Sequence, residues 1–431
     1  MKILFLFHII LICFISSIIT SENFALYDFN TSTHFTKNFS TPFKSNFTWF
    51  HYKTFTVISH IIEGQKPDYL NSLTLVLHIS NDRSFNGLED RLKNWDGPIS
   101  LGIYMVNDKI MSAETECTIC TLKSYLKDRN NVSVHFIFKK TNISDDDMIY
   151  LKKATFCDNF NVDKKQNQCV IVNRKDKLKK LVSYPINTIR NVARKLAHTK
   201  FLIVTDSDQM FSPDFIKKVL PVVKKGYSKN KKTVYVIRVF ETVSENYIDG
   251  PKNKKELHRM LEDHKAFVFH HQNIIYLGIP KLREWFKVKD NNQSSIQFEN
   301  PYNNDAWEPK IIIPDDAPYH DENFPYPYRD NTVMRWSLCI EGYKFLVLNN
   351  VFMYHLGVKS LNESNNMREA RRINRSKYLS ARKNFTKRYR KKYSKNVDVC
   401  MKVPNVEERK KLLSDNIFIL KSFRKQRRMY K

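Results

Sequence analysis

The most informative segment of the chain is Phe201-Leu-Ile-Val-Thr-Asp206-Ser-Asp208-Gln-Met-Phe-Ser-Pro-Asp214. Its first four residues are apolar and predict a buried strand. The Ser-Pro pair near its end predicts a helix start, with Ser as the N-cap and Pro at the first helical position. Ligands of an open α/β sheet bind beyond the carboxyl ends of its strands. Asp206 and Asp208 are therefore expected at a ligand-binding edge, although an Asp-x-Asp sequence alone also fits a surface turn.

Two carboxylates one residue apart at such an edge can share a hard divalent cation, whose remaining ligands are substrate phosphates. This arrangement suits an enzyme that acts on a nucleotide-sugar, because the metal neutralises the charge that develops on the departing diphosphate. We therefore interpret Asp206 and Asp208 as candidate metal ligands.

Apolar runs typical of buried strands alternate with helix-compatible segments on both sides of this motif. The strand runs cover residues 73–79, 99–105, 132–138, 201–204, 234–240 and 345–348, and the helical segments cover 84–95 and 186–197. Strands that alternate with helices favour a Rossmann-like, mostly parallel α/β sheet with helices on both faces.

Length and composition predict a large globular body with added segments. The chain has 431 residues, of which 42% are hydrophobic and 13% aromatic, which excludes a disordered chain, a collagen and a disulfide mini-protein. Changes in residue composition along the chain predict a signal anchor or signal peptide at 1–20, a stem at 21–68, an α/β domain at 69–376 and a basic tail at 377–431.

The first twenty residues contain an apolar run from Ile3 to Ile19. A secretory h-region typically has about 7–15 residues and a membrane-spanning helix about 20, and this run lies between them. The run favours an uncleaved anchor and a single-pass type II membrane protein with a lumenal body. A cleaved signal peptide with a secreted protein is the alternative, and a buried soluble helix is a third interpretation.

Six cysteines follow the apolar run: Cys117, Cys120, Cys157, Cys169, Cys339 and Cys400. In an oxidising lumen six cysteines can pair in fifteen different ways. The Cys117-x-x-Cys120 spacing also resembles half of a zinc site, but no second pair of ligands follows at the required distance. Nine N-glycosylation sequons support a lumenal location only weakly in so asparagine-rich a chain.

The charge is strongly basic, with 72 Lys and Arg against 44 Asp and Glu and a net charge of +28. A lumenal protein does not normally meet nucleic acid, so we expect no nucleic-acid partner. The basic excess is concentrated in residues 377–395 and 421–431. This part of the chain is either a solvated tail or a surface that attracts polyanionic glycans or an anionic membrane.

Residues before the Asp-x-Asp strand, Tyr184-Pro-Ile-Asn-Thr-Ile-Arg190-Asn191-Val-Ala, lead directly into it. With the strand, they resemble glycosyltransferase family 49, which contains the β-1,4-glucuronyltransferase of dystroglycan glycosylation and the glucuronyltransferase domain of LARGE-type enzymes. The resemblance covers roughly residues 70–360. Further matching segments follow in the same order: Leu73-Thr-Leu-Val, Asp82-Arg83, Trp95-Asp-Gly-Pro-Ile-Ser, Phe240-Glu241-Thr242, Glu308-Pro309 with Tyr319 and Phe324, and residues 342–355.

The resemblance implies a GT-A fold, a UDP-sugar donor, Mn²⁺ or another divalent cation, and inversion at the anomeric carbon. By position it assigns Asp206, Asp208 and His355 to the metal site. We expect Asp82, Arg83, Arg190, Asn191 and Asp206 to bind the donor. From the residues themselves, an arginine suits bidentate contact with phosphate or a sugar carboxylate, with a structural ion pair as the alternative.

An inverting transfer needs a general base, normally a carboxylate, to take the proton of the acceptor hydroxyl. Our first candidate is Asp330, and Glu241, Glu308 and Asp316 are its rivals. Asp330 lies in Pro325-Tyr-Pro-Tyr-Arg-Asp330-Asn331, where the familiar members carry a glycine-rich stretch with Trp-Asn. This departure leaves the acceptor and the donor sugar open.

The sequence thus predicts a metal-dependent, inverting glycosyltransferase of the Golgi membrane. It would move glucuronic acid or N-acetylglucosamine from a UDP-sugar to a glycan acceptor on glycoproteins, and it leaves homodimers and heterodimers open. One alternative is a catalytically silent lumenal relative that binds glycans or assists another transferase. Another is a secreted, basic glycosaminoglycan-binding protein.

Overall fold

The computed structural model describes residues 47–83, 85, 88–127, 129–157, 169–170, 174–269, 278–358, 365–405 and 407–408. The predicted signal anchor at 1–20 and much of the predicted stem lie outside these residues. Within the described residues, no helix combines the length and the apolar character that crossing a membrane requires.

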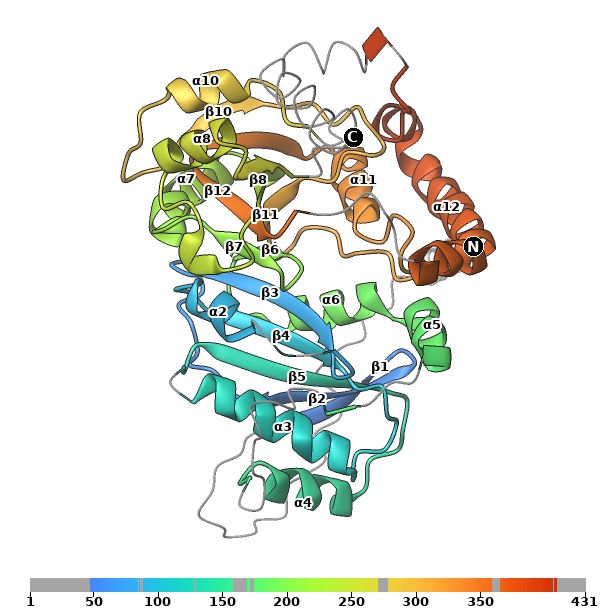
Figure 1. The fold of residues 1–431 in the computed structure, drawn as a ribbon. Helices are drawn as coiled ribbons and strands as arrows, with labels where there is room; N and C mark the ends of the chain where they lie inside the picture. The colour runs from blue at the N-terminus through green and yellow to red at the C-terminus, as the bar shows by residue number, and fades with distance from the viewer. Residues whose placement is uncertain are drawn as a thin grey trace, which may run out of the picture. The chain divides into compact units, whose positions relative to one another are not determined.

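The described body is built on one sheet, which Figure 1 shows running through its centre. The sheet has the order β1-β2-β5-β4-β3-β6-β11-β8-β12-β10, with β7 paired to β12 and β9 paired to β8. The strands are β1 (Thr48–Tyr52), β2 (Phe55–Ile62), β3 (Leu73–Ser80), β4 (Ile99–Tyr104), β5 (Val132–Lys139), β6 (Phe201–Val204), β7 (Gln209–Phe211), β8 (Thr233–Thr242), β9 (Ala266–Val268), β10 (Ile296–Glu299), β11 (Lys310–Pro314) and β12 (Lys344–Leu356).

The sheet is mixed, which corrects the prediction of a mostly parallel one. Strands β5, β4, β3 and β6 are parallel neighbours, as are β8 and β12. Strand β11 lies between β6 and β8 and is antiparallel to both, and β1, β2 and β10 add antiparallel pairs at the edges. An apolar run predicts a buried strand but not its direction, which explains the difference.

Helices cover both faces of the sheet, as predicted. Side chains of α2, α3 and α7 share one core cluster with alternate residues of β3, β4 and β5. Side chains of α6, α11 and α12 pack on the other face. The helices are α2 (Leu88–Lys93), α3 (Ala113–Leu126), α4 (Asp145–Ala154), α5 (Arg174–Ser183), α6 (Ile186–Lys195), α7 (Phe215–Lys229), α8 (Lys254–Glu262), α10 (Leu282–Lys287), α11 (Thr332–Ile340) and α12 (Asn365–Cys400).

Part of the predicted stem belongs to the sheet instead. Residues 48–62 form β1 and β2, and β2 pairs with β5. His60 lies in β2 with a φ of 57°, and the register of the β2–β5 pair shifts between Ile58 and Ile62. This bulge interrupts the alternation of side chains, so the sequence does not display the period of two that signals a strand.

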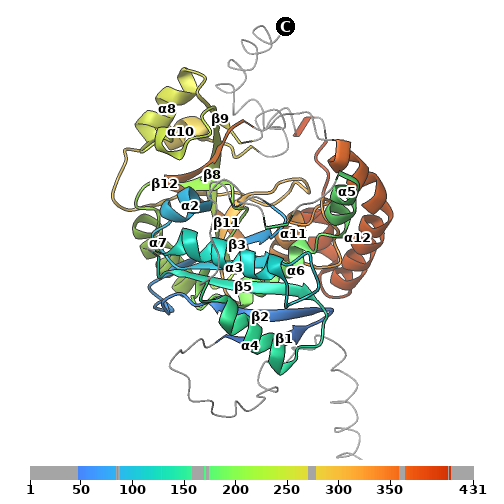
Figure 2. The same cartoon turned by 60° about the horizontal axis from the view of Figure 1, so that its bottom comes forward.

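The predicted boundary at residue 376 falls inside a helix. Helix α12 runs from Asn365 to Cys400, and Figures 1 and 2 show it beside α5 and α11. Its buried side chains include Ala381, Phe385 and Val397, which join the core on that face of the sheet. Much of the predicted basic tail is therefore part of the globular body.

All six cysteines after the apolar run form disulfides. The pairs are Cys117–Cys169, Cys120–Cys157 and Cys339–Cys400. Both cysteines of the Cys-x-x-Cys sequence are thus bonded to distant partners. The third bond joins the end of α12 to α11. Helix α11 also forms part of the wall of the cavity that the next section describes.

Candidate active site

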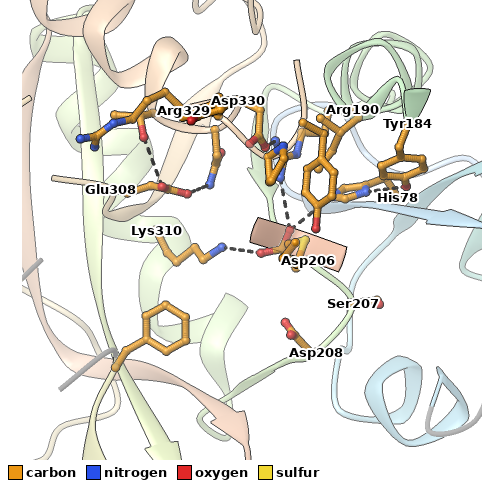
Figure 3. Close-up of a pocket in the computed structure, with 18 of the residues that line it drawn as sticks. His78, Tyr184, Arg190, Asp206, Ser207, Asp208, Glu308, Lys310, Arg329 and Asp330 are labelled. Atoms are coloured by element: carbon orange, nitrogen blue, oxygen red, sulfur yellow. Dashed lines mark hydrogen bonds and ion pairs between the residues drawn. The ribbon is translucent and has the colours of Figure 1, made fainter. Parts of the chain in front are cut away.

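A cavity of about 1510 Å³ opens at the carboxyl ends of β3 and β6, and the start of β11 and α12 complete its wall. Figure 3 shows the polar side chains that face it. Seven of the residues predicted from sequence line this cavity: Asp82, Arg83, Arg190, Asp206, Asp208, Glu308 and Asp330. The cavity therefore brings together residues that are up to 248 positions apart in the chain (330 − 82).

The Asp206 carboxylate is surrounded by donors from neighbouring elements. Its Oδ2 lies 3.1 Å from Lys310 Nζ, and its Oδ1 lies 3.2 Å from His78 Nε2 and 3.3 Å from Arg190 Nη2. Strand register explains two of these contacts. Strands β3 and β6 are parallel, and Val76 of β3 lies opposite Val204 of β6. His78 and Asp206 each follow these residues by two positions, so they lie side by side. Lys310 approaches from the antiparallel strand β11.

These donors fix the protonation of Asp206. Burial alone would raise the pKa of Asp206, but the charge of Lys310, the hydrogen bond from His78 and the charge of Arg190 hold it well below its usual range. Burial lowers the pKa of His78, so its imidazole is neutral. Its two contacts assign the tautomer: Nε2–H donates to Asp206, and Nδ1 accepts from the Tyr184 hydroxyl at 3.2 Å.

Arg190 links Asp206 to a second carboxylate. Its Nη1 donates to Asp330 Oδ2 at 2.9 Å, and Figure 3 shows the guanidinium between the two acids. Burial raises the pKa of Asp330, and the Arg190 charge opposes that rise only in part. Asp330 is thus a buried carboxylate at the cavity wall with a raised affinity for a proton, as a general base requires.

Asp208 pairs with a different partner. Its Oδ2 lies 2.9 Å from His355 Nε2, while His355 Nδ1 donates to the Gly357 carbonyl oxygen at 2.8 Å. The antiparallel pair of β7 with β12 sets this contact, because Gln209 lies opposite His355. In Figure 3 the Asp208 carboxylate lies apart from the network around Asp206.

The pair of Asp208 and His355 fits a divalent cation. A metal-binding histidine usually donates its second ring N–H to a carbonyl or carboxylate, as His355 does to Gly357. No group of three or more His, Cys, Asp or Glu side chains gathers as a metal site among the described residues. Asp208 and His355 can supply two protein ligands to such a cation, and water or phosphate oxygens can supply others. Asp206 is already neutralised by cationic side chains.

Four predicted residues do not line the cavity: Asn191, Glu241, Asp316 and His355, of which His355 contacts the cavity residue Asp208. The Asn191 amide donates to the His320 carbonyl oxygen at 2.8 Å and to Glu322 at 2.7 Å, so it holds the loop that follows β11 rather than a donor. Glu241 is fully buried within β8. Asp316 is half-exposed and pairs with Lys200 at 3.4 Å, outside the cavity. These positions argue against donor contact by Asn191 and against Glu241 and Asp316 as the base.

No sequence pattern indicates two cavity residues of the Asp206 network, His78 and Lys310. His78 belongs to the apolar run at 73–79, whose pattern predicts only a buried strand. Lys310 follows Glu308-Pro309 and begins β11, whose antiparallel position between β6 and β8 no local pattern reveals. Glu308 also lines the cavity, where it accepts hydrogen bonds from Asn331 Nδ2 and, at 3.2 Å, from Thr332 Oγ1.

Replacing Lys310 by Met should destabilise the protein at neutral pH. Removing one member of a fully buried ion pair costs about 3–5 kcal/mol. Asp206 is 36% exposed and keeps Arg190, so we expect a loss of about 1–2 kcal/mol in the free energy of unfolding. Lys344→Met, which removes an exposed pair with Glu299, is the control and should cost less than about 0.5 kcal/mol.

The effect of Lys310→Met should depend on pH in a defined direction. The depressed pKa of Asp206 means that its ion pairs stabilise the fold above the ordinary aspartate pKa of about 4 and lose that effect as the pH falls through the folded value. The deficit of the variant should therefore shrink as the pH is lowered. Denaturant unfolding at neutral and acidic pH measures it, and an equal deficit at both would contradict the assignment.

Comparison with known proteins connects this site to a family. The family model for glycosyl-transferases for dystroglycan matches residues 72–394. The xylosyl- and glucuronyltransferase LARGE2s of Danio rerio is 25% identical over 304 residues, and LARGE1 of Homo sapiens is 24% identical over 290. These alignments cover 68% and 66% of this chain but 32% and 31% of the relatives, so the chain spans about a third of their length.

Two solved structures align with low TM-scores. S. aureus TarS 1-349 aligns at a TM-score of 0.33 and 12% identity, over 81% of this chain and 80% of that one. GalNAc-T7 with UDP, GalNAc and Mn²⁺ aligns at 0.35 and 12% identity, over 78% and 56%. The sequence match spans Asp206, Asp208, Asp330 and His355 and most of the chain. The chain belongs to glycosyltransferase family 49, the glycosyl-transferases for dystroglycan.

Proposed function

We propose that this chain is a metal-dependent, inverting glycosyltransferase with a GT-A fold. It moves glucuronic acid or N-acetylglucosamine from a UDP-sugar to a glycan acceptor on glycoproteins. The observation that supports this best is that Asp208 and the Asp206–Arg190–Asp330 network line the same cavity. The Asp208–His355 pair fits a divalent cation, and the Asp206–Arg190–Asp330 network holds a buried carboxylate with a raised pKa.

Asp330 is the proposed general base. Its carboxylate takes the proton of the acceptor hydroxyl while the acceptor oxygen forms a bond to the anomeric carbon, and the bond from that carbon to the diphosphate breaks with UDP leaving. Arg190 positions Asp330 through the 2.9 Å contact, and its charge opposes the rise that burial causes in the pKa of Asp330. Glu308 is the remaining candidate in the cavity, but its hydrogen bonds to Asn331 and Thr332 engage it at the start of α11.

Asp208 and His355 are proposed to hold Mn²⁺ or another divalent cation. When bound, such a cation neutralises negative charge on a diphosphate. Lys310 and Arg190 add fixed positive charge on the other side of the Asp-x-Asp turn, where they also neutralise Asp206. Asp82 and Arg83 follow the carboxyl end of β3 and are proposed to contact the base and ribose of the donor.

We further propose a lumenal location, with the chain held in the Golgi membrane by residues 1–20. A secreted form remains the alternative that the sequence leaves open. Three disulfides agree with an oxidising compartment, because such bonds are rare in proteins of the cytosol.

The test is donor turnover by the full-length chain. The protein is incubated with Mn²⁺ and a panel of UDP-sugars, and UDP release is scored with and without EDTA. Release from one donor that EDTA abolishes would support the proposal and identify the sugar. Stabilisation by UDP and Mn²⁺ in a thermal-shift assay without turnover would favour a silent glycan-binding relative. Neither turnover nor stabilisation with any nucleotide would reject the proposal.

A further inference from the structure

The loop between β11 and α11 carries the proposed base, Asp330, near its end. Buried polar side chains of α6 hold the earlier part of this loop. Asn191 donates to the His320 carbonyl oxygen at 2.8 Å and accepts from the His320 N–H at 3.1 Å. Arg194 donates to the Pro318 carbonyl oxygen at 2.7 Å. Helix α6 therefore supplies hydrogen bonds that the backbone of this irregular loop needs.

Asn187 of α6 links this part of the loop to the base. Its Nδ2 donates to the Asp321 carbonyl oxygen at 2.9 Å, and its Oδ1 accepts from Arg190 Nη1 at 3.1 Å. The same Nη1 donates to Asp330 Oδ2 at 2.9 Å. A shift of the loop along α6 would therefore change how Arg190 meets Asp330.

The Glu322 carboxylate joins the loop, α6 and the β1–β2 hairpin at one point. Its Oε1 accepts from Asn191 Nδ2 at 2.7 Å and from the Tyr52 hydroxyl at 2.6 Å. Its Oε2 accepts from Thr188 Oγ1 at 3.0 Å and lies 3.0 Å from Lys53 Nζ. The Glu322 side chain is only 10% exposed, so donors of the protein rather than water satisfy its charge.

Tyr52 is the better fixed of the two hairpin donors. Tyr52 and Phe55 pack against a core cluster that includes Ile189 and Val192 of α6. The packed ring holds the Tyr52 hydroxyl in place. Lys53 is instead 53% exposed, and an exposed lysine gains little from an ion pair because its long side chain must be ordered. We therefore expect Tyr52 to contribute more than Lys53.

We propose that Glu322 and Tyr52 are positioning residues for the transfer. They fix the loop on α6 so that Arg190 holds Asp330 toward the acceptor hydroxyl. The β1–β2 hairpin thereby serves the reaction, although none of its residues, all of which the structure describes, lines the cavity. Asn191 contributes by holding Glu322. The inference rests on the proposed transferase function with Asp330 as the base.

Two tyrosine variants of the full-length chain provide the test. Tyr52→Phe removes only the hydroxyl that donates to Glu322. Tyr389→Phe is the matched control, because Tyr389 is also half-buried and its hydroxyl donates to Glu341 Oε1 at 2.9 Å, away from the cavity. Both variants should lose similar stability in denaturant unfolding, since each loses one hydrogen bond to a carboxylate.

Kinetics should separate the two variants. Tyr52→Phe should lower kcat by about tenfold, because a displaced base slows the chemical step. Its KM for the UDP-sugar should change by about twofold or less, because no donor contact is lost. Tyr389→Phe should keep both constants within about twofold of the wild type. An unchanged kcat in Tyr52→Phe, or an equal loss in Tyr389→Phe, would overturn the proposal.

A double-mutant cycle tests whether Tyr52 acts through Glu322. Glu322→Gln keeps the size of the side chain but supplies only one acceptor oxygen and no charge, so it should also lower kcat by about tenfold. Adding Tyr52→Phe to Glu322→Gln should lower kcat little further, because the partner of the hydroxyl is already altered. Losses that multiply in the double variant would show that the two residues act independently and would overturn the proposal.

Hydrogen exchange of backbone amides distinguishes this inference from the proposed function. Tyr52→Phe should speed exchange in residues 318–331, and Tyr389→Phe should not. If the wild type transfers no sugar from any donor, the proposed function fails and the positioning role fails with it. Faster exchange of the loop in Tyr52→Phe would then show only that the hairpin holds the loop.

Discussion

Asp208→Asn should lower kcat/KM by about 1,000-fold, which corresponds to about 4 kcal/mol of lost transition-state stabilisation. Asp208 is the carboxylate that contacts His355, and these two side chains are the proposed protein ligands of the divalent cation. An amide at this position supplies no negative charge to the cation. The expected consequence is a loss of cation affinity, and the protein should still fold because Asp208 lies at the cavity surface and is partly exposed.

A thermal-shift titration with Mn²⁺ separates this effect from a general loss of activity. The wild-type protein should be stabilised by Mn²⁺ in the presence of UDP, and Asp208→Asn should show little stabilisation at the same concentrations. Asp316→Asn is the matched control, because Asp316 lies outside the cavity and pairs with Lys200. A variant at Asp208 that keeps both its Mn²⁺ response and its activity would show that the cation site lies elsewhere.

Asp330→Asn should lower kcat by about 1,000-fold, within the range that general-base catalysis contributes. The amide keeps the size of the side chain but cannot accept the proton of the acceptor hydroxyl. Burial raises the pKa of Asp330, and a base must be ionised, so wild-type kcat should fall as the pH drops through that raised value. The residual activity of Asp330→Asn should lack this acidic limb.

Glu308→Gln distinguishes the two carboxylates of the cavity wall. If Asp330 is the base, Glu308→Gln should keep the acidic limb of the pH profile even where it lowers activity. Binding of UDP should persist in Asp330→Asn, because the Asp208–His355 pair does not involve Asp330. Loss of the acidic limb in Glu308→Gln and its retention in Asp330→Asn would assign the base to Glu308.

Local sequence patterns predicted the central part of the molecule. The strand at 201–204, the carboxylates that follow it and the helix at 186–195 all lie where the patterns indicated. Each of these features depends on residues close together in the chain. His355 was identified by family resemblance; it lies in β12 and contacts Asp208.

The partners of Asp206 could not be predicted in the same way. Lys310 reaches Asp206 across 104 positions because β11 inserts antiparallel between β6 and β8. His78 reaches it because β3 and β6 are parallel neighbours, which depends on strand order rather than on local pattern. The same limit applies to α12, whose many charges mask the few buried positions that attach it to the core.

The attachment of α12 restricts how the enzyme can be shortened. Phe385 packs against Phe324 and Trp336 with ring centroids 5.8 and 5.9 Å away, and Cys400 closes the disulfide to Cys339. A truncation near residue 376 would expose this aromatic cluster and leave a free thiol on α11. Deleting the basic region would thus damage the scaffold of the cavity. The charge of α12 can be separated from its structural role only by point substitutions on the outer side of the helix.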